Sequence, residues 1–289
     1  MAFLPVRGIP HYYEWVTLPQ TTHPKPVMVF LHGWGGSSRY WQSTAASLSD
    51  RFDCLLYDLR GFGRSSQVYS AYPGVPVGAS LSEPYELETY ADDLAALLDE
   101  LGLPQVYLNA HSMGASIATF FLNRYPHRVA RAILTCSGVF DYNPQAFQQF
   151  HQFGGYVVKF RPRWLALVPG VDRLFMARFL CRPIPPPERQ HFLEDFLLAD
   201  FEAALGTMIT AVSEKAARVM PTEFAQLTVP TLLVAGERDR IIPAQMGEQA
   251  AAYNPLVQFQ VLPQTAHFPM LEDASAYLEC VSQFLDAAS

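Results

Sequence analysis

The sequence predicts an α/β fold, in which a mostly parallel central sheet is flanked by helices and carries an inserted helical cap. Short apolar runs of strand length alternate with amphipathic stretches of helical length, as expected for βα units. Reactive side chains follow several of these runs directly, where parallel sheets gather functional groups. The alternation stops between residues 139 and 221, where helical segments follow one another.

The first part of the chain supplies the start of this sheet. Residues 9–18 are expected to form a hairpin strand, Val27–Leu31 a buried strand, residues 40–48 a helix and residues 53–58 a central strand. Residues 67–84 are rich in Gly, Pro and Ser and predict a long loop. Because long loops at such a place are more often functional than idle, we expect this loop to help shape the site.

The following segments continue the alternation. Residues 87–101 predict an amphipathic helix, because leucines and Tyr90 recur at helical spacing with acidic residues on the other faces. Further strands are expected at residues 105–109, 129–136, 231–235 and 257–262, and helices at 115–124 and 274–285. The core domain would therefore comprise residues 1–138 and 222–289, with residues 139–221 as the cap.

The cap segment is unusually aromatic. Six rings lie three or four residues apart and would share one helix face: Phe147, Phe150, Phe153, Tyr156, Phe160 and Trp164. This pattern favours a core for the cap, with the lining of an apolar substrate pocket as the alternative. The apolar residues 164–180 are interspersed with arginines, so peripheral contact of the cap with a membrane surface is a third possibility.

Length and composition limit the function classes. A chain of 289 residues, 50% hydrophobic and 16% charged, is long enough for one α/β core with an insertion. The formal net charge of −7 gives no indication of the basic surface that nucleic-acid binding requires. The first ten residues lack the apolar stretch of a signal peptide, and no run reaches the length of a membrane span. We therefore expect a cytoplasmic protein.

The segment from Ala110 to Gly114 predicts a serine nucleophile at Ser112. It reads Ala-His-Ser-Met-Gly and joins a strand to a helix, so the serine would sit on a sharp, strained turn. Small residues two positions before and after it allow the strand and the helix to cross closely. Alanine replaces the more common glycine at position 110, which costs clearance but removes no reactive group.

Other segments of the chain supply a candidate base and a candidate acid for Ser112. A glycine-rich turn from His32 to Ser38 follows one strand and can direct backbone N–H groups at a developing oxyanion. Asp239 and His267 follow two later strands, so the chain presents Ser, Asp and His in that order. We predict that His267 is the general base for Ser112 and that Asp239 orients its ring.

These motifs make the chain resemble the α/β-hydrolase fold superfamily over nearly its whole length. The motifs are the His32-Gly33 turn, residues 58–65 (DLRGFGRS), the turn at Ser112, residues 236–239 (GERD) with Pro243, and residues 266–268 (AHF). Alanine at positions 110, 115 and 266 departs from the common glycine but keeps a small residue. The resemblance implies an oxyanion hole formed by the backbone N–H groups of Trp34 and Met113.

Some assignments have competitors. Glu237 lies in the same turn as Asp239, and Asp141 follows a strand from which some members of the fold supply their acid. Five other histidines compete with His267 as the base: His32, His111, His127, His151 and His191. We expect His32 and Asp58 to be structural through hydrogen bonds in turns, and His111 to help form the turn at Ser112.

The leading functional hypothesis is a serine hydrolase that cleaves a carboxylic ester, or thioester, of a hydrophobic small molecule through an acyl-enzyme on Ser112. A serine at this position excludes dehalogenases and epoxide hydrolases of the same fold, which use aspartate. A C–C bond hydrolase or perhydrolase would use the same three residues, and a slow-turnover ligand receptor is the alternative from another class. No phosphate loop, metal-spaced histidine set or dinucleotide fingerprint occurs, so we expect no cofactor and no metal.

Overall fold

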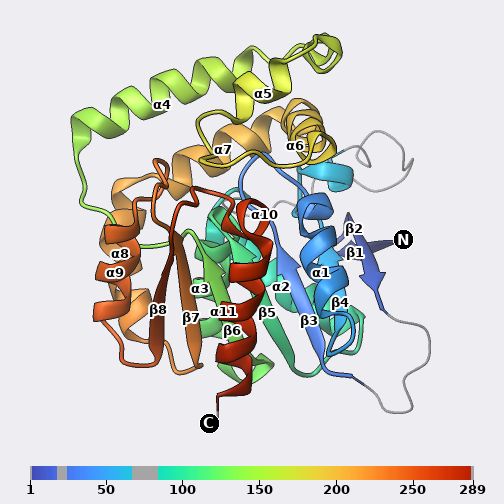
Figure 1. Cartoon of the computed structure of the whole chain (residues 1–289), viewed down its shortest axis with the longest axis vertical. Helices are drawn as coiled ribbons and strands as arrows, with labels where there is room; N and C mark the ends of the chain where they lie inside the picture. Colours follow the sequence, from blue (N-terminus) through green and yellow to red (C-terminus); the bar gives the residue numbers. More distant parts are fainter. Residues whose placement is uncertain (1, 18–24, 67–83, 288–289) are drawn as a thin grey trace.

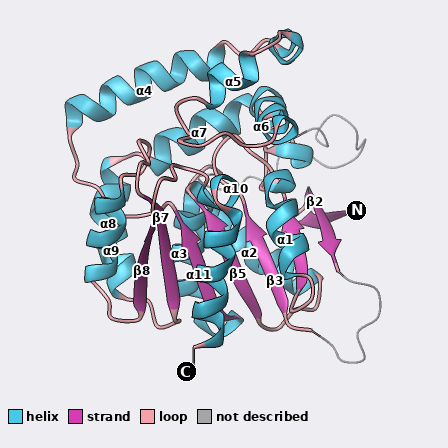
Figure 2. Cartoon of the chain, in the orientation of Figure 1, coloured by secondary structure: helices cyan, strands magenta, loops and turns pink. Residues whose placement is uncertain are grey.

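The computed structural model describes residues 2–17, 25–66 and 84–287 and has an eight-stranded sheet at its centre (Figures 1 and 2). The strand order is β1-β2-β4-β3-β5-β6-β7-β8. β2 pairs antiparallel with both β1 and β4, and all other neighbours are parallel, so the predicted α/β fold class is confirmed. The strands are β1 (Ala2–Val6), β2 (Ile9–Val16), β3 (Val27–Leu31), β4 (Asp53–Tyr57), β5 (Val106–His111), β6 (Val129–Thr135), β7 (Thr231–Gly236) and β8 (Val257–Leu262).

Burial explains which strands were easy to recognise in the sequence. The central strands β3, β4 and β7 are buried on both faces and read as unbroken apolar runs. The edge strand β1 alternates between partly buried and exposed residues, contains Pro5, and was not predicted. β1 pairs antiparallel with β2, and a run of only five residues was too short to predict this strand.

Helices cover both faces of the sheet (Figure 1). α1 and α11 pack on one face, while α2, α3, α8 and α9 cover the other. The helices are α1 (Gln42–Leu48), α2 (Leu87–Glu100), α3 (Met113–Arg124), α4 (Pro144–Lys159), α5 (Val171–Met176), α6 (Pro186–Leu198), α7 (Phe201–Ala211), α8 (Glu214–Ala225), α9 (Ala244–Ala252), α10 (Pro269–Glu272) and α11 (Ala274–Asp286). Short 3-10 helices lie at η1 (Ser38–Trp41), η2 (Gly63–Ser65), η4 (Pro126–Arg128) and η5 (Arg163–Leu167).

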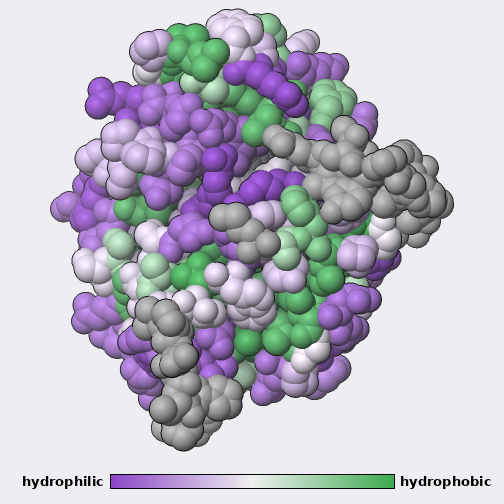
Figure 3. All heavy atoms as spheres, turned by 90° about the vertical axis from the view of Figure 1, so that its right-hand side faces the viewer, coloured by the Kyte–Doolittle hydropathy of each residue, from purple (hydrophilic) through white to green (hydrophobic). Residues whose placement is uncertain are grey.

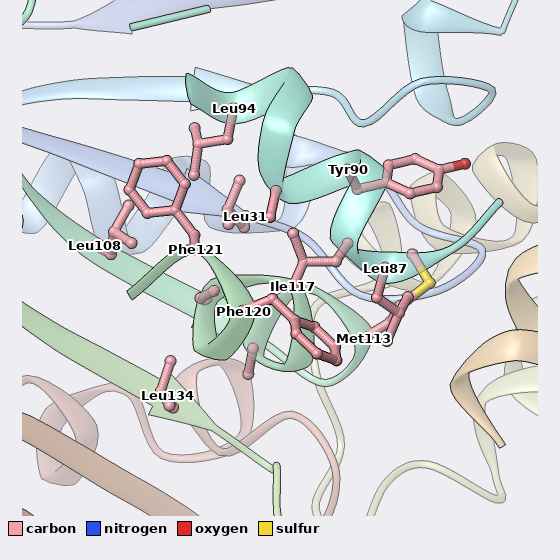
Figure 4. Packing of buried hydrophobic residues seen from close by; sticks show 14 of the residues in the cluster. Leu31, Leu87, Tyr90, Leu94, Leu108, Met113, Ile117, Phe120, Phe121 and Leu134 are labelled. Carbon is pink, nitrogen blue, oxygen red and sulfur yellow. The ribbon is translucent and has the colours of Figure 1, made fainter. Parts of the chain in front are cut away.

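The larger core cluster fixes α3, the helix that follows Ser112. Figure 4 shows Ile117 and Phe121 of α3 beside Leu94 of α2 and Leu108 of β5. All four side chains are fully buried. Burial of such side chains stabilises the fold by about 1.5–3 kcal/mol each, so α3 is held firmly against the sheet.

The helices α4, α5, α6 and α7 and the turn η5, here called the inserted helices, lie between β6 and β7 in sequence. They extend across the end of the sheet where β5 and β7 finish (Figure 1). The predicted cap boundary at residue 221 falls inside α8, which packs against α3 and α9 in the helical layer of the sheet. The predicted loop 67–84 lies outside the described residues except for Pro84.

The aromatic stripe of the cap is not a core. Phe153, Tyr156, Phe160 and Trp164 are 57–72% exposed, so the prediction that they pack inside the cap is wrong. The reason is that α4 contacts α7 through its opposite face, where Val158 is its buried residue. None of the described helices is both long and apolar enough to cross a bilayer.

Two glycine substitutions test the close packing behind Ser112. A Cβ at Gly114 would overlap the carbonyl oxygen of His32, so Gly114→Ala should destabilise the protein by about 1–3 kcal/mol. Gly155 in α4 has open space around it, and Gly155→Ala should stabilise by roughly 0.5–1 kcal/mol through helix propensity. Urea unfolding measures both. Equal free energies of unfolding for the two variants would contradict this packing.

Candidate active site

Ser112 lies in the turn between β5 and α3 with a strained backbone. Its φ of 54° and ψ of −122° fall in a region that residues other than glycine rarely occupy. The Ser112 N–H donates to the carbonyl of Thr135 on β6 at 2.8 Å, which ties the turn to the neighbouring strand. The residue remains partly exposed.

His267 brings its ring to this hydroxyl from the loop between β8 and α10. Its Nε2 lies 3.1 Å from Ser112 Oγ, and its Nδ1 lies 2.7 Å from Asp239 Oδ2. His267 is 4% exposed and Asp239 is 6% exposed. Ser112 and Asp239 are thus each within hydrogen-bonding distance of His267. With Nδ1–H donating to the carboxylate, Nε2 is free to accept the serine proton.

Asp239 is held as a carboxylate in the turn after β7. Burial alone would raise its pKa, but the His267 ring outweighs this effect, together with N–H donors from Ile241 and Ile242 at 2.7 and 3.1 Å. The pKa of Asp239 therefore lies below its ordinary value. A charged acceptor at this position fixes the orientation of the imidazole and stabilises its protonated form.

The predicted oxyanion donors, Trp34 and Met113, lie beside Ser112. Met113 is the first residue of α3, so its N–H has no partner within the helix. Trp34 lies in the turn after β3, and its neighbour Gly33 approaches so closely that an added Cβ would be 3.0 Å from Ser112 Cβ. The Trp34 indole donates to the Ala204 carbonyl of α7 at 2.8 Å, which connects this turn to the inserted helices.

Tyr40 is a positioning residue that the sequence did not reveal. Its hydroxyl accepts from the Gly33 N–H and lies 2.9 Å from His111 Nδ1. His111 Nε2 lies 2.7 Å from the His267 carbonyl oxygen. This arrangement makes His111 a neutral ring that donates from Nε2, and burial, followed by the charge of His267, lowers its pKa well below the ordinary value. His111 thus joins the β3 turn to the backbone of the candidate base.

A second missed residue, Glu272, organises the loop that carries His267. One carboxylate oxygen accepts from the Ala266 N–H at 2.8 Å, and the other accepts from the Cys181 and Arg182 N–H groups at 2.6 and 2.8 Å. The His267 N–H itself donates to the Phe179 carbonyl at 2.9 Å. The base therefore rests on the segment between α5 and α6. No motif signals a carboxylate five residues after a histidine.

The rival acids lie elsewhere. Asp141 is exposed after β6, and Glu237 accepts a hydrogen bond from the Gln264 N–H at 2.8 Å rather than from His267. The expected structural roles of His32 and Asp58 are confirmed. His32 Nε2 accepts from the Leu59 N–H at 2.9 Å, and Asp58 accepts from Ser38 and Arg64.

The other candidate histidines are hydrogen-bonded to other groups or belong to other elements of the fold. His151 Nε2 lies 2.6 Å from the Val212 carbonyl in the inserted helices, and His127 belongs to η4 after α3. His191 lies in α6. Of the described histidines, His267 is the one whose ring is hydrogen-bonded to the Ser112 hydroxyl.

One described group of side chains has the spacing of a metal site: His111, Cys136 and His267 lie with their ligand atoms within 4.8 Å. Both nitrogens of each histidine are already engaged as above. Burial, and next the charge of Asp239, raises the pKa of the Cys136 thiol well above its ordinary value. Since a metal requires the thiolate, this group is better suited to supporting the turn than to binding an ion.

The inserted helices place aromatic rings around the edge of the site. Phe179 lies 6.1 Å from the His267 ring, and Phe192 packs edge-on against Phe268 at 5.1 Å. Phe196 lies 5.5 Å from Trp34. A substrate approaching Ser112 from this side would meet a mainly apolar environment.

Polar contacts attach α6 and α7 to the loops at the end of the sheet. Ser37 of the turn after β3 and Arg39 of η1 both bind Asp195 of α6. The Asp200 N–H, directly before α7, donates to the Gly61 carbonyl at 2.8 Å. Burial raises the pKa of Asp195 to about 6 despite Arg39. Burial likewise raises the pKa of Asp200 to about 7, against the opposing effect of Arg161.

Removing the Tyr40 hydroxyl should destabilise the protein. Tyr40→Phe leaves the Gly33 N–H and His111 Nδ1 without this partner in a buried region, so the free energy of unfolding should fall by about 1–3 kcal/mol. The matched control is Tyr253→Phe directly after α9, where the residue is 50% exposed and the change should stay within about 0.5 kcal/mol. An equally small effect at Tyr40 would contradict the proposed link.

Asp200→Asn should change the pH dependence of stability. Because the folded-state pKa is raised, the protonated carboxyl stabilises the fold below pH about 4, and this contribution is lost as the pH rises through about 7. Asparagine resembles the protonated form at every pH and is also a good residue to precede a helix. The variant should exceed wild type by on the order of 1 kcal/mol at pH 8, since partial solvent exposure reduces the effect, and by little at pH 4.5. Urea midpoints that differ equally at both pH values would contradict this account.

Comparison with known proteins agrees with this geometry. A family model described as alpha/beta hydrolase fold matches residues 26–274. The chain is 25% identical over 295 residues to the putative carbamate hydrolase RutD of Pseudomonas savastanoi pv. phaseolicola, covering 91% of this chain and 94% of the relative. It is 31% identical over 192 residues to the (lyso)-N-acylphosphatidylethanolamine lipase of Bos taurus, covering 64% of this chain and 51% of that protein.

Among solved structures, a thermophilic esterase from Thermogutta terrifontis is similar, with a TM-score of 0.72 and 25% identity over 96% of this chain and 93% of the esterase. The family model covers far more than half of the sequence, and its range contains Ser112, Asp239 and His267. The chain therefore belongs to the alpha/beta hydrolase fold family.

Proposed function

We propose that the protein is a serine hydrolase that cleaves a carboxylic ester, or thioester, of a hydrophobic substrate through an acyl-enzyme on Ser112. The observation that carries this proposal is the hydrogen-bonded series from Ser112 Oγ through His267 to Asp239. The strained, partly exposed position of Ser112 supports it further. Esterase, lipase and carbamate hydrolase names among the similar proteins agree with acyl transfer to water.

The reaction would begin with attack of Ser112 Oγ on the carbonyl carbon. His267 Nε2 takes the serine proton as the bond forms, and Asp239 stabilises the resulting imidazolium. The negative charge moves to the carbonyl oxygen, which the N–H groups of Trp34 and Met113 would bind. Such a donor typically contributes about 2.7–4 kcal/mol to transition-state stabilisation.

Collapse of the tetrahedral intermediate releases the alcohol or thiol, which takes its proton from His267. Water then attacks the acyl group on Ser112, and His267 acts again as general base. The second tetrahedral intermediate expels the serine oxygen, which recovers the proton. The acid and the regenerated enzyme complete the cycle without a cofactor.

A hydrophobic substrate is supported by the aromatic rings near the triad. Phe179 and Phe268 lie 6.1 and 5.6 Å from the His267 ring, and Phe192 packs beside Phe268. Phe192 comes from α6, Phe179 from the segment between α5 and α6, and Phe268 from the loop that carries His267. The inserted helices would therefore act as a cap that selects the acyl or alcohol group, since specificity depends on the shape of the pocket.

Hydrolysis of p-nitrophenyl esters with acyl chains from acetyl to palmitoyl tests the proposal. Wild type should turn over, with a preference above acetyl, and Ser112→Ala should lower kcat by about 10⁴-fold or more because the nucleophile is lost. Undiminished turnover by Ser112→Ala would refute the serine mechanism. Labelling of Ser112 by a fluorophosphonate without ester turnover would favour a C–C bond hydrolase or a receptor instead.

Two aspartate variants test the assignment of the acid. Asp239→Asn should lower kcat by about 10⁴-fold, because the amide no longer holds the required tautomer of His267. Asp141→Asn is the matched control, since this exposed carboxyl is the competing position, and its kcat should match wild type. The reverse pattern would assign the acid to Asp141.

A further inference from the structure

The outer face of α4 presents a row of aromatic side chains to solvent. Its members come from α4, its C-terminal cap and η5, and we call them the aromatic ridge: Phe150, Phe153, Tyr156, Phe160 and Trp164. Their exposed fractions are 42, 64, 72, 71 and 57%. Single exposed rings are ordinary on protein surfaces, but five exposed rings within 15 residues of the chain indicate an interaction surface.

Packing of α4 does not account for the ridge. The helix is already attached to α7 through its other face, where His151 bonds to the Val212 carbonyl and Gly154 lies against the side chain of Met208. Val158 is buried on that face as well. A helix attached in this way normally exposes polar residues on its free side. The aromatic ridge instead exposes apolar surface to water, and it does not contribute to the packing of α4 on α7.

Two exposed leucines extend the apolar surface beyond α4. Leu167 in η5 is 83% exposed and Leu174 in α5 is 77% exposed. Figure 3 shows hydrophobic side chains in green gathered at the upper end of the molecule, next to strongly hydrophilic ones in purple. The surface is therefore mixed, with apolar and charged groups side by side.

The charge of this region is opposite to that of the rest of the chain. Residues 142–182 contain six Lys or Arg and one Asp, a net charge of +5. The remaining residues contain 14 Lys or Arg and 26 Asp or Glu, a net charge of −12. Lys159, Arg163, Arg173 and Arg178 are exposed, and the single acid, Asp172, pairs with Arg189. The exposed basic residues thus belong to the same segment of the chain as the exposed rings.

We propose that the aromatic ridge docks the protein on the surface of an anionic lipid bilayer. Aromatic and leucine side chains would enter the boundary between headgroups and acyl chains, while the basic residues would contact acidic headgroups. A second copy of the chain fits less well, because two ridges brought together would each carry the same positive charge. The acidic remainder of the chain would be repelled by the same bilayer and so would face away from it.

This docking is independent of chemistry at Ser112 and goes beyond the proposed hydrolysis. Its consequence is orientation, because the inserted helices lie across the end of the sheet where Ser112 and His267 are placed (Figure 1). A molecule dissolved in the bilayer would then meet the protein from the side of the inserted helices.

Sedimentation with vesicles tests the proposal. Wild type should bind vesicles of 70% phosphatidylcholine and 30% phosphatidylglycerol at low salt, with weaker binding to pure phosphatidylcholine and partial release at high salt. The double variant Phe153→Ser/Phe160→Ser should weaken binding about tenfold or more, because each ring loses its apolar burial. The control Tyr253→Ser, a 50% exposed ring directly after α9, should bind as wild type.

Charge variants separate the electrostatic contribution to vesicle binding from the apolar one. Arg163→Gln and Arg173→Gln should each weaken binding to the anionic vesicles about fivefold, with no effect on pure phosphatidylcholine. Arg218→Gln on α8, 74% exposed at its side chain, is the matched control and should change nothing.

Unchanged binding by the double ridge variant, or no binding by wild type to either vesicle, would overturn the proposal. A wild-type dimer in analytical ultracentrifugation that the double variant abolishes, without vesicle binding, would assign the ridge to self-association instead. Because the substituted rings are exposed, urea midpoints should be unchanged and serve as the check on folding.

Discussion

The positive φ of Ser112 is the constraint on which the site depends. Neighbouring elements hold Ser112 in this strained backbone conformation. Its N–H donates to the Thr135 carbonyl on β6, and α3 begins at the next residue. Glycine is required two residues further, at Gly114, because the carbonyl of His32 occupies the space of a side chain. The buried contacts between α3 and the sheet supply the stability that holds this strain.

The backbone of His267 is where the sheet domain and the inserted helices meet. Its carbonyl accepts from His111, and its N–H donates to the Phe179 carbonyl in the segment leading to α6. Glu272 binds backbone groups on both sides of this contact. Movement of the inserted helices would therefore change the position of the His267 ring that contacts Ser112. The buried Asp195 and the partly buried Asp200 lie at the same boundary.

The sequence predicted the parts of the molecule that local pattern determines. The central strands were recognisable because they are buried on both faces, and Ser112, Asp239 and His267 stood out because each follows such a strand. Tyr40 and Glu272 could not be found in this way, since their roles arise from contacts with residues far along the chain. The aromatic stripe of α4 was recognised as one helix face, but periodicity cannot say whether such a face points toward protein or away from it.

The most direct measurement for the central claim is intact-mass analysis with peptide mapping after treatment with an alkyl fluorophosphonate. The account predicts a single stoichiometric adduct on the peptide that contains Ser112, formed much more slowly in His267→Ala because the general base is absent. Ester hydrolysis by a protein that carries no adduct at Ser112, or an adduct whose rate is independent of His267, would contradict it.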